Sequence, residues 1–380
     1  MRYLAVAVIA VSAAAGLVAT QIASAPTTRV APTRVPVPRH DTPPHATAEP
    51  SRARPPQFVI SSFDGAGGSQ LWKYWLSVAA RAHAHFTFFL SGVYLIDWDQ
   101  HDRYAPPVGP RGTSAIGFAP TQAWADGTAQ EVAAGYLDGM EIGTHYNGHF
   151  CGPGGVGTWT AKDWSDELSQ FDRLVFAPGT NLPFGPQEIV GGRTPCLEGN
   201  LDALYPVLAK DGFRYDASHT ALLGTWPSKR FGIWSFPLLE LPFVGHTFRV
   251  VSMDYNFMAN QINESPAQIE NETYRTLWNA FKVSYLGNRA PLSLGNHFET
   301  WESSAYDEAL TRFLVRACAL PEVRCASFRE LADWLDTQTP QQRARDRAGR
   351  FPHATAKALQ TELRSQIHLR DVSDTSQRPK

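Results

Sequence analysis

The chain has 380 residues, of which 43% are apolar and 12% aromatic, and its formal net charge is -2 at pH 7. This composition excludes disorder along the whole length and supplies enough apolar surface for one large domain or two smaller ones. The near-zero charge gives no electrostatic basis for nucleic acid as the main partner, and it favours a neutral or weakly charged substrate.

Residues 1–25 are typical of a signal peptide. Arg2 supplies a positive charge, residues 4–18 are almost entirely Ala, Val, Leu, Ile and Gly, and Ala23-Ser24-Ala25 forms a small-residue cleavage motif. Because Pro26 is an awkward residue after a cleavage site, an uncleaved membrane anchor is the alternative. In either case we expect an exported protein, extracellular or associated with the cell envelope.

Three further regions follow the leader. Residues 26–57 are rich in Pro, Thr, Ala and Arg without a hydrophobic period, which predicts an extended linker. A single folded domain is expected over 58–339, and a polar, Arg-rich tail over 340–380. The domain begins with expected strands at 58–63 and 86–90 around a helical segment, so it opens with a β-α-β unit.

Short apolar runs then alternate with amphipathic segments. Strands are expected at 141–143, 248–253 and 291–294. Thr160 and Asp163 are spaced to cap one helix, and Asn200 is placed to begin another that Gly212 ends. Further helices are expected at 128–137, 268–285, 303–317 and 327–335. This alternation favours an α/β sheet or barrel with helices outside.

The four cysteines form an even set, as expected of disulfides in an oxidising compartment. Cys318 and Cys325 flank a short turn that contains proline, so they are expected to pair locally and leave Cys151 with Cys196. A zinc site is the rival interpretation, and the absence of any C-x-x-C pair argues against it.

The segment Glu141–His149, EIGTHYNGH, places two histidines four residues apart. Imidazoles at this spacing can share one divalent metal on a helix face or across a loop. The metalloprotease pattern H-E-x-x-H does not fit, because Tyr146 stands where its glutamate belongs.

Polar residues end three other expected strands. Asp64 follows the first strand, Arg193 lies within Gly192-Arg193-Thr194-Pro195, and His297 follows Leu294-Gly295-Asn296. The carboxyl ends of parallel strands meet at one rim, where α/β folds place their active sites. We therefore expect these residues and the two histidines to form one site.

In its motifs and their order, the chain resembles the polysaccharide deacetylases, carbohydrate esterase family four, over about residues 58–335. The motifs that carry the resemblance are Ser62-Phe63-Asp64-Gly65, His145-x-x-x-His149, Arg193-x-Pro195, the segment Gly212–Ser218 and His297. The resemblance implies an α/β fold, a distorted parallel β/α barrel, and a divalent metal, with zinc expected first and cobalt or another divalent ion as alternatives.

The resemblance also implies roles for single residues. His145, His149 and an aspartate of the first motif would hold the metal, Arg193 would orient the aspartate, and His297 would be the general acid. The family's first motif carries two consecutive aspartates, a base and then a metal ligand, whereas this chain has Asp64 and Gly65. Asp64 is therefore either base or ligand, and one role is left vacant.

The vacant role has several candidate occupants, namely Asp97, Asp99, Asp254 or a water. Tyr146 and Asn147, between the two histidines, and Trp301, four residues after His297, are expected to contact substrate. Residues 93–128, rich in Asp, Pro and Gly, form a long insertion that is expected to shape the substrate groove.

The sequence thus predicts a metal-dependent hydrolase that removes N- or O-acyl groups, acetyl first, from a cell-envelope or environmental polysaccharide or oligosaccharide. The alternative is a carbohydrate-binding pseudoenzyme of the same fold that has lost turnover with the missing aspartate. No protein partner is implied.

Overall fold

The structure is a computed structural model that describes residues 54–375. The expected signal peptide or anchor at 1–25, and all but the last residues of the expected linker at 26–57, lie outside the described residues. Within 54–375, each helix is either too short or too polar to cross a membrane.

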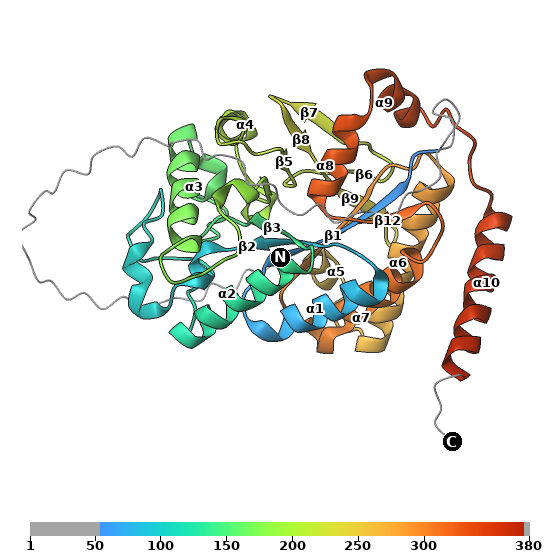
Figure 1. Ribbon diagram of the computed structural model, residues 1–380, viewed down its shortest axis with the longest axis horizontal. Helices are drawn as coiled ribbons and strands as arrows, with labels where there is room; N and C mark the ends of the chain where they lie inside the picture. Colours follow the sequence, from blue (N-terminus) through green and yellow to red (C-terminus); the bar gives the residue numbers. More distant parts are fainter. Residues whose placement is uncertain (1–53, 376–380) are drawn as a thin grey trace, which may run out of the picture. The chain divides into compact units, whose positions relative to one another are not determined.

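A largely parallel sheet organises the domain (Figure 1). Its strands are β1 (Gln57–Gly65), β2 (Thr87–Leu90), β3 (Glu141–Thr144), β4 (Gly191–Gly192), β5 (Tyr215–Asp216), β7 (Ser228–Arg230), β8 (Ile233–Ser235), β11 (Leu292–His297) and β12 (Val323–Cys325). The order is β11-β1-β2-β3-β4-β5-β8-β7, with β12 also paired to β1 and only β7 antiparallel. The predicted α/β class is confirmed. Among the described residues the barrel is open, because the strand path runs from β11 to β7 without closing.

A small second sheet and ten α-helices complete the described part of the chain. The second sheet contains β6 (Thr220–Leu222), β9 (Leu238–Pro242) and β10 (Arg249–Val251). The helices are α1 (Ser69–Ala82), α2 (Gln122–Leu137), α3 (Ala161–Val175), α4 (Leu201–Lys210), α5 (Asp254–Met258), α6 (Pro266–Leu286), α7 (Trp301–Ala317), α8 (Phe328–Thr337), α9 (Pro340–Arg347) and α10 (Ala356–Thr375). Thr160 and Asp163 form the expected capping box at α3, and the Asn200 side chain caps α4.

The central strand β1 is buried along nearly its whole length. Every residue of β1 except Gly65 is buried, as expected of a parallel strand covered on both faces. On one face, Phe63 packs against Trp75 with ring centroids 4.3 Å apart, and Trp72 stacks on Phe88 at 4.0 Å. This aromatic core fixes β1 against α1 and so fixes the position of the residues at the end of the strand.

The strand register brings the expected site residues to one edge. Asp64 of β1 is the direct partner of His297 of β11, and Thr144 of β3 pairs with Gly192 of β4. His145 and Arg193 are the next residues along β3 and β4. The carboxyl ends of β11, β1, β3 and β4, four of five consecutive strands in the sheet, therefore carry the predicted side chains, as the parallel arrangement requires.

Both predicted disulfides are present. Cys151 is bonded to Cys196, and Cys318 is bonded to Cys325. Beyond residue 339 the chain is helical in α9 and α10, and Arg347 of α9 donates a hydrogen bond to the carbonyl of Pro227 at 2.8 Å. The boundary at 339 between domain and tail stays a prediction.

Candidate active site

A buried ion pair forms the base of the site. Arg193 Nη1 donates to Asp64 Oδ1 at 2.7 Å, and Arg193 Nε donates to the carbonyl of Ala217 at 3.0 Å. Both side chains are almost fully buried. Burial alone would raise the pKa of Asp64, but the positive charges of Arg193 and His297 lower it below the ordinary value. Asp64 is therefore held as a carboxylate.

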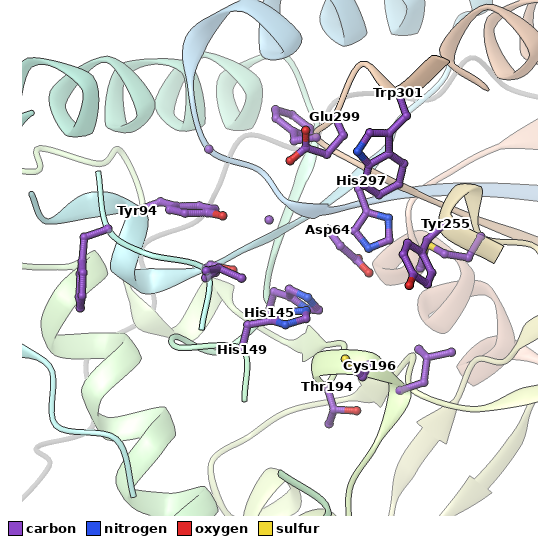
Figure 2. A pocket seen from close by; sticks show the side chains of 18 of the residues that line it. Asp64, Tyr94, His145, His149, Thr194, Cys196, Tyr255, His297, Glu299 and Trp301 are labelled. Atoms are coloured by element: carbon purple, nitrogen blue, oxygen red, sulfur yellow. The ribbon is translucent and has the colours of Figure 1, made fainter. Parts of the chain in front are cut away.

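Two neutral imidazoles lie beside this ion pair (Figure 2). Their ring centroids are 4.9 Å apart, and His145 Nδ1 lies 2.8 Å from the carbonyl oxygen of Arg193. When Nδ1 carries the proton and donates it to that carbonyl, Nε2 is left free to bind a metal. Burial lowers the pKa of His145 to about 3 and lowers that of His149, so both rings are in the neutral form that a metal ligand requires.

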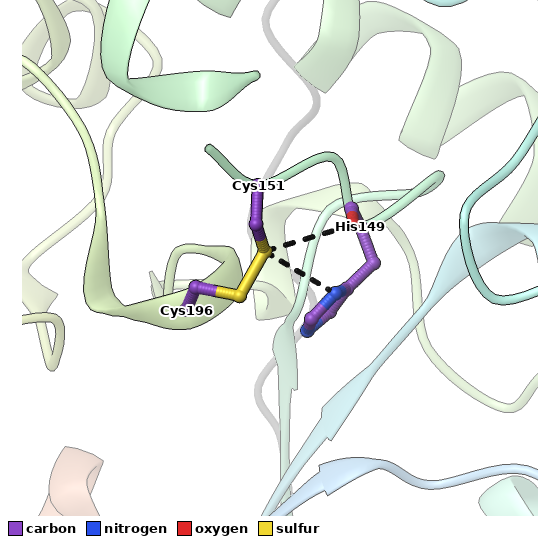
Figure 3. A group of neighbouring side chains, drawn as sticks. All are labelled: His149, Cys151 and Cys196. Carbon is purple, nitrogen blue, oxygen red and sulfur yellow. Dashed lines mark hydrogen bonds between the residues drawn. A yellow bond between two sulfur atoms is a disulfide. The ribbon is translucent and has the colours of Figure 1, made fainter. Parts of the chain in front are cut away.

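The Cys151–Cys196 disulfide supports the loop that carries His149 (Figure 3). Cys151 Sγ lies 3.7 Å from His149 Nδ1, and His149 itself has a left-handed backbone with φ 56°. Since Cys151 follows β3 and Cys196 follows β4, the bond joins the two segments that carry His149 and Arg193. The disulfide therefore holds His149 in an otherwise unfavourable conformation beside the ion pair.

His297 is bound by a carboxylate that the sequence did not assign to it. Its ring Nδ1 lies 2.6 Å from Asp254 Oδ1, and its backbone N–H donates to Asp254 Oδ2 at 2.7 Å. Burial alone would lower the pKa of His297, but the Asp254 carboxylate raises it to about 9. At neutral pH His297 is therefore an imidazolium, the form required of a general acid.

These groups open into one cavity of about 660 Å³. Figure 2 shows Asp64, His145, His149 and His297 around it, with Tyr94 on one side and Tyr255 and Trp301 on the other. The Trp301 ring lies 5.2 Å from that of His297, so the predicted substrate residue lines the cavity. The insertion after β2 also lines it, through Tyr94, Ile116, Phe118, Pro120 and Trp124.

Tyr146 and Asn147 do not line the cavity, which corrects the expectation that they contact substrate. Both are fully buried. The backbone N–H of Asn147 donates to Glu167 Oε1 at 2.9 Å, and its Nδ2 donates to the Glu167 carbonyl at 3.0 Å. Tyr146 packs against Trp164 of α3. The two residues therefore anchor the loop between the histidines to α3.

The candidates for the vacant role lie elsewhere. Asp97 caps a short 3₁₀ helix that contains Asp99, and neither lines the cavity. Asp254 is engaged by His297. Gly65, which an ungapped alignment would place at the second aspartate of the motif, has φ 90°, and apart from its chain neighbours only Tyr94 among the described residues would come within 4 Å of a Cβ placed there. The position is open but has no ligand atom.

The donor set fits a divalent metal through two imidazoles. Among the described residues, the two groups with three ligand atoms within 4.8 Å of one another are His149, Cys151 and Cys196, and His246, Glu264 and Glu272. Asp64, His145 and His149 do not form such a group, and the first group is occupied by the disulfide. The His145 carbonyl contact is the arrangement that orients an imidazole toward a metal.

No protein-family model and no curated protein matches the sequence significantly. Among solved structures, a candidate polysaccharide deacetylase from Mycobacterium smegmatis shares 16% identity over 83% of this chain and 97% of its own, with a TM-score of 0.48. A family 4 carbohydrate esterase from Streptomyces lividans shares 14% identity over 70% and 91%, with a TM-score of 0.38. A carbohydrate esterase family four pseudoenzyme from Bacillus anthracis shares 12% identity over 74% and 68%, with a TM-score of 0.41.

Proposed function

We propose that this chain is an exported, metal-dependent hydrolase that removes N- or O-acyl groups from a polysaccharide or oligosaccharide. One observation carries the proposal: a buried carboxylate, two neutral imidazoles and a protonated imidazole line one cavity at the ends of β1, β3 and β11. The two disulfides fit an oxidising compartment.

In this proposal, His145 and His149 hold the metal through ring nitrogens. A bound divalent ion would polarise the acyl carbonyl and lower the pKa of a water ligand from about 15.7 to about 7. The Arg193 carbonyl keeps His145 in the required tautomer, and the disulfide keeps His149 in place.

Asp64 takes the role of general base. Of its two possible roles, its ion pair with Arg193 supports the base, because Arg193 keeps the carboxylate ionised and fixes one oxygen. The other oxygen is free of that bond and can accept a proton from the attacking water. General base catalysis of this kind is typically worth about 10²- to 10⁴-fold in rate.

His297 donates a proton to the leaving amine or alkoxide. Asp254 binds its Nδ1, so the proton on Nε2 is the one available to substrate. The same carboxylate stabilises the imidazolium before transfer. Trp301 and Tyr255, beside His297, are placed to stack on the sugar that leaves.

The test is acetate release from acetylated chitooligosaccharide and from peptidoglycan, measured on the full chain loaded with zinc or cobalt and again after treatment with a chelator. We expect release that the chelator abolishes and that added metal restores. Release that is insensitive to chelation would contradict the metal role, and absence of release on every acylated glycan would contradict the proposed activity.

Gly65 favours a second candidate, a carbohydrate-binding pseudoenzyme. With no third ligand assembled among the described residues, metal affinity would fall and turnover with it. Glycan binding without turnover at saturating zinc or cobalt would support this candidate. Turnover that His145→Ala abolishes would remove it.

A further inference from the structure

The two aromatic sides of the cavity differ in their relation to the general acid. Tyr255 and Trp301 surround His297, with ring centroids 6.3 and 5.2 Å from its ring. Tyr94 lies on the opposite side of Asp64 and the two other histidines (Figure 2). A scissile carbonyl carbon carries two substituents, the acyl chain and the leaving group. When this carbonyl lies at His145 and His149, one substituent must point toward Tyr94 and the other toward Tyr255 and Trp301.

The identity of each substituent follows from proton transfer. The leaving group must lie within hydrogen-bond reach of the general acid, which places it on the side of His297, Tyr255 and Trp301. The acyl group is bonded to the same carbonyl carbon and points away from the leaving group. It therefore enters the side of the cavity that Tyr94 lines.

On this acyl side of the cavity, the absence of a side chain at Gly67 lets two aromatic rings pack against the backbone. A Cβ at Gly67 would lie 2.6 Å from Trp124 Cη2 and 2.7 Å from Tyr94 Cδ2, so a side chain there would displace both rings. The two rings meet edge to face, with centroids 5.6 Å apart. The segment that follows Asp64 thus forms the floor of an aromatic chamber.

The insertion after β2 completes the wall of this chamber. Ile116, Phe118 and Pro120 line the cavity beside Trp124. Phe118 in turn contacts Trp98, whose side chain is 61% exposed, at a centroid distance of 5.9 Å. Apolar side chains therefore extend from the reactive centre toward solvent, and Glu299 and Ser91 are the polar residues that also line the cavity near Tyr94.

We propose that Tyr94, Ile116, Phe118 and Trp124 form a chamber for an apolar acyl group several carbons longer than acetyl. This inference rests on the proposed function and names its substrate class, an amide or ester of a sugar with a medium-length fatty acyl chain. The whole cavity, which must hold the sugar as well as the acyl group, has a volume of about 660 Å³. Pockets of about 300–1,000 Å³ bury ligands of drug size, so this cavity has room for a sugar residue together with an acyl chain longer than acetyl.

The experiment compares N-acetyl-, N-butyryl- and N-octanoylglucosamine as substrates of the metal-loaded full chain, with release of glucosamine as the readout. We expect kcat/KM to rise by about fourfold for each methylene that enters the chamber. A preference for acetyl, falling steadily with chain length, would overturn the inference while leaving the proposed deacylation intact.

Three substitutions test whether the preference for longer acyl chains arises in the chamber. Phe118→Ala should reduce kcat/KM for the octanoyl substrate at least about tenfold more than for the acetyl substrate, because each lost apolar contact acts on the longer chain alone. Gly67→Ala, which displaces Tyr94 and Trp124, should do the same. Phe231→Ala, at an exposed phenylalanine outside the cavity, is the matched control and should leave the ratio unchanged. Equal ratios in all three variants would overturn the inference.

Binding separates failure of the chamber from failure of the chemistry. If no acylglucosamine is hydrolysed, the proposed function is still decided by acetate release from the oligomeric and polymeric substrates, and the chamber is tested by tryptophan fluorescence with N-octanoylglucosamine and N-acetylglucosamine as ligands. Tighter binding of the octanoyl compound, lost in Phe118→Ala, would support the chamber. Binding that is independent of chain length would exclude it.

Discussion

Asp254 binds His297 with both carboxylate oxygens, one on the ring Nδ1 at 2.6 Å and one on the backbone N–H at 2.7 Å. The double contact fixes the ring orientation and its charge together. Because Asp254 belongs to α5 and His297 to the end of β11, the contact also ties these two elements across the cavity wall.

The pH profile should report this contact. A general acid acts only while protonated, and the pKa of His297 is raised to about 9, so kcat/KM should fall as the pH rises through about 9. Asp254→Asn removes the raising charge and leaves the burial that lowers the pKa, so this alkaline limb should move to lower pH by roughly one to three units. Asp166→Asn, which removes a half-exposed surface carboxylate, should leave the limb in place. An unchanged limb in Asp254→Asn would show that His297 is not the titrating acid.

The buried ion pair should dominate the effect of mutations on stability at the site. Arg193→Met leaves the Asp64 carboxylate buried without its partner and should lower the free energy of unfolding by about 3–5 kcal/mol. The double variant Asp64→Asn/Arg193→Met should recover part of that loss. Arg230→Met, at an exposed ion pair, should cost less than about 1 kcal/mol. Urea unfolding measures all three, and equal losses for Arg193→Met and Arg230→Met would contradict the assignment.

Position 65 offers a direct test of the missing ligand. Gly65→Asp and Gly65→Ala both place a Cβ at φ 90°, and each should lose about 1–3 kcal/mol of stability to backbone strain. The space beside Tyr94 admits the side chain, so only the aspartate should raise zinc affinity, measured by calorimetry. Equal zinc affinity in the two variants would show that a carboxylate at 65 cannot reach the imidazole pair.

Loss of the two disulfides should have different effects on stability and on zinc affinity. Cys151→Ser/Cys196→Ser opens a loop of 45 residues and should cost about 4 kcal/mol of stability, compared with about 2 kcal/mol for Cys318→Ser/Cys325→Ser, whose cysteines are 7 apart. The first pair alone supports His149, so only its loss should weaken zinc binding. Equal zinc affinity in both double variants, measured by titration, would separate the disulfide from the metal site.

Sequence alone predicts the parts of this site that follow from strand order. The convergence of Asp64, His145, Arg193 and His297 requires only that their strands run parallel and close together in one sheet, and the strand order and register confirm that arrangement. The pairing of Cys318 with Cys325 is similarly local. The assignment of the metal ligands and of the catalytic roles stays a prediction.

The parts of the site that the sequence did not predict depend on tertiary packing. Asp254 meets His297 because α5 packs against β11, and no spacing along the chain encodes a contact between residues 43 apart. Tyr146 and Asn147 lie between two histidines that line the cavity, yet their own side chains point inward to α3. The backbone is left-handed at Tyr146 and His149, and this reverses the direction of the loop. The strands β8 and β9 were not expected from the sequence.

The bond between Cys151 and Cys196 also bears on how a polymer enters. It couples the segments after β3 and β4 into a single rigid rim. Residues 92–124 contain no cysteine, but hydrogen bonds tie them to the loop of the same rim: the Gly148 N–H donates to Tyr104 Oη at 3.2 Å, and the Ala115 N–H donates to the Gly148 carbonyl at 2.7 Å. The segment that lines the acyl side is therefore anchored to the disulfide-bonded rim, and an incoming glycan chain meets an entrance whose shape is set before it binds.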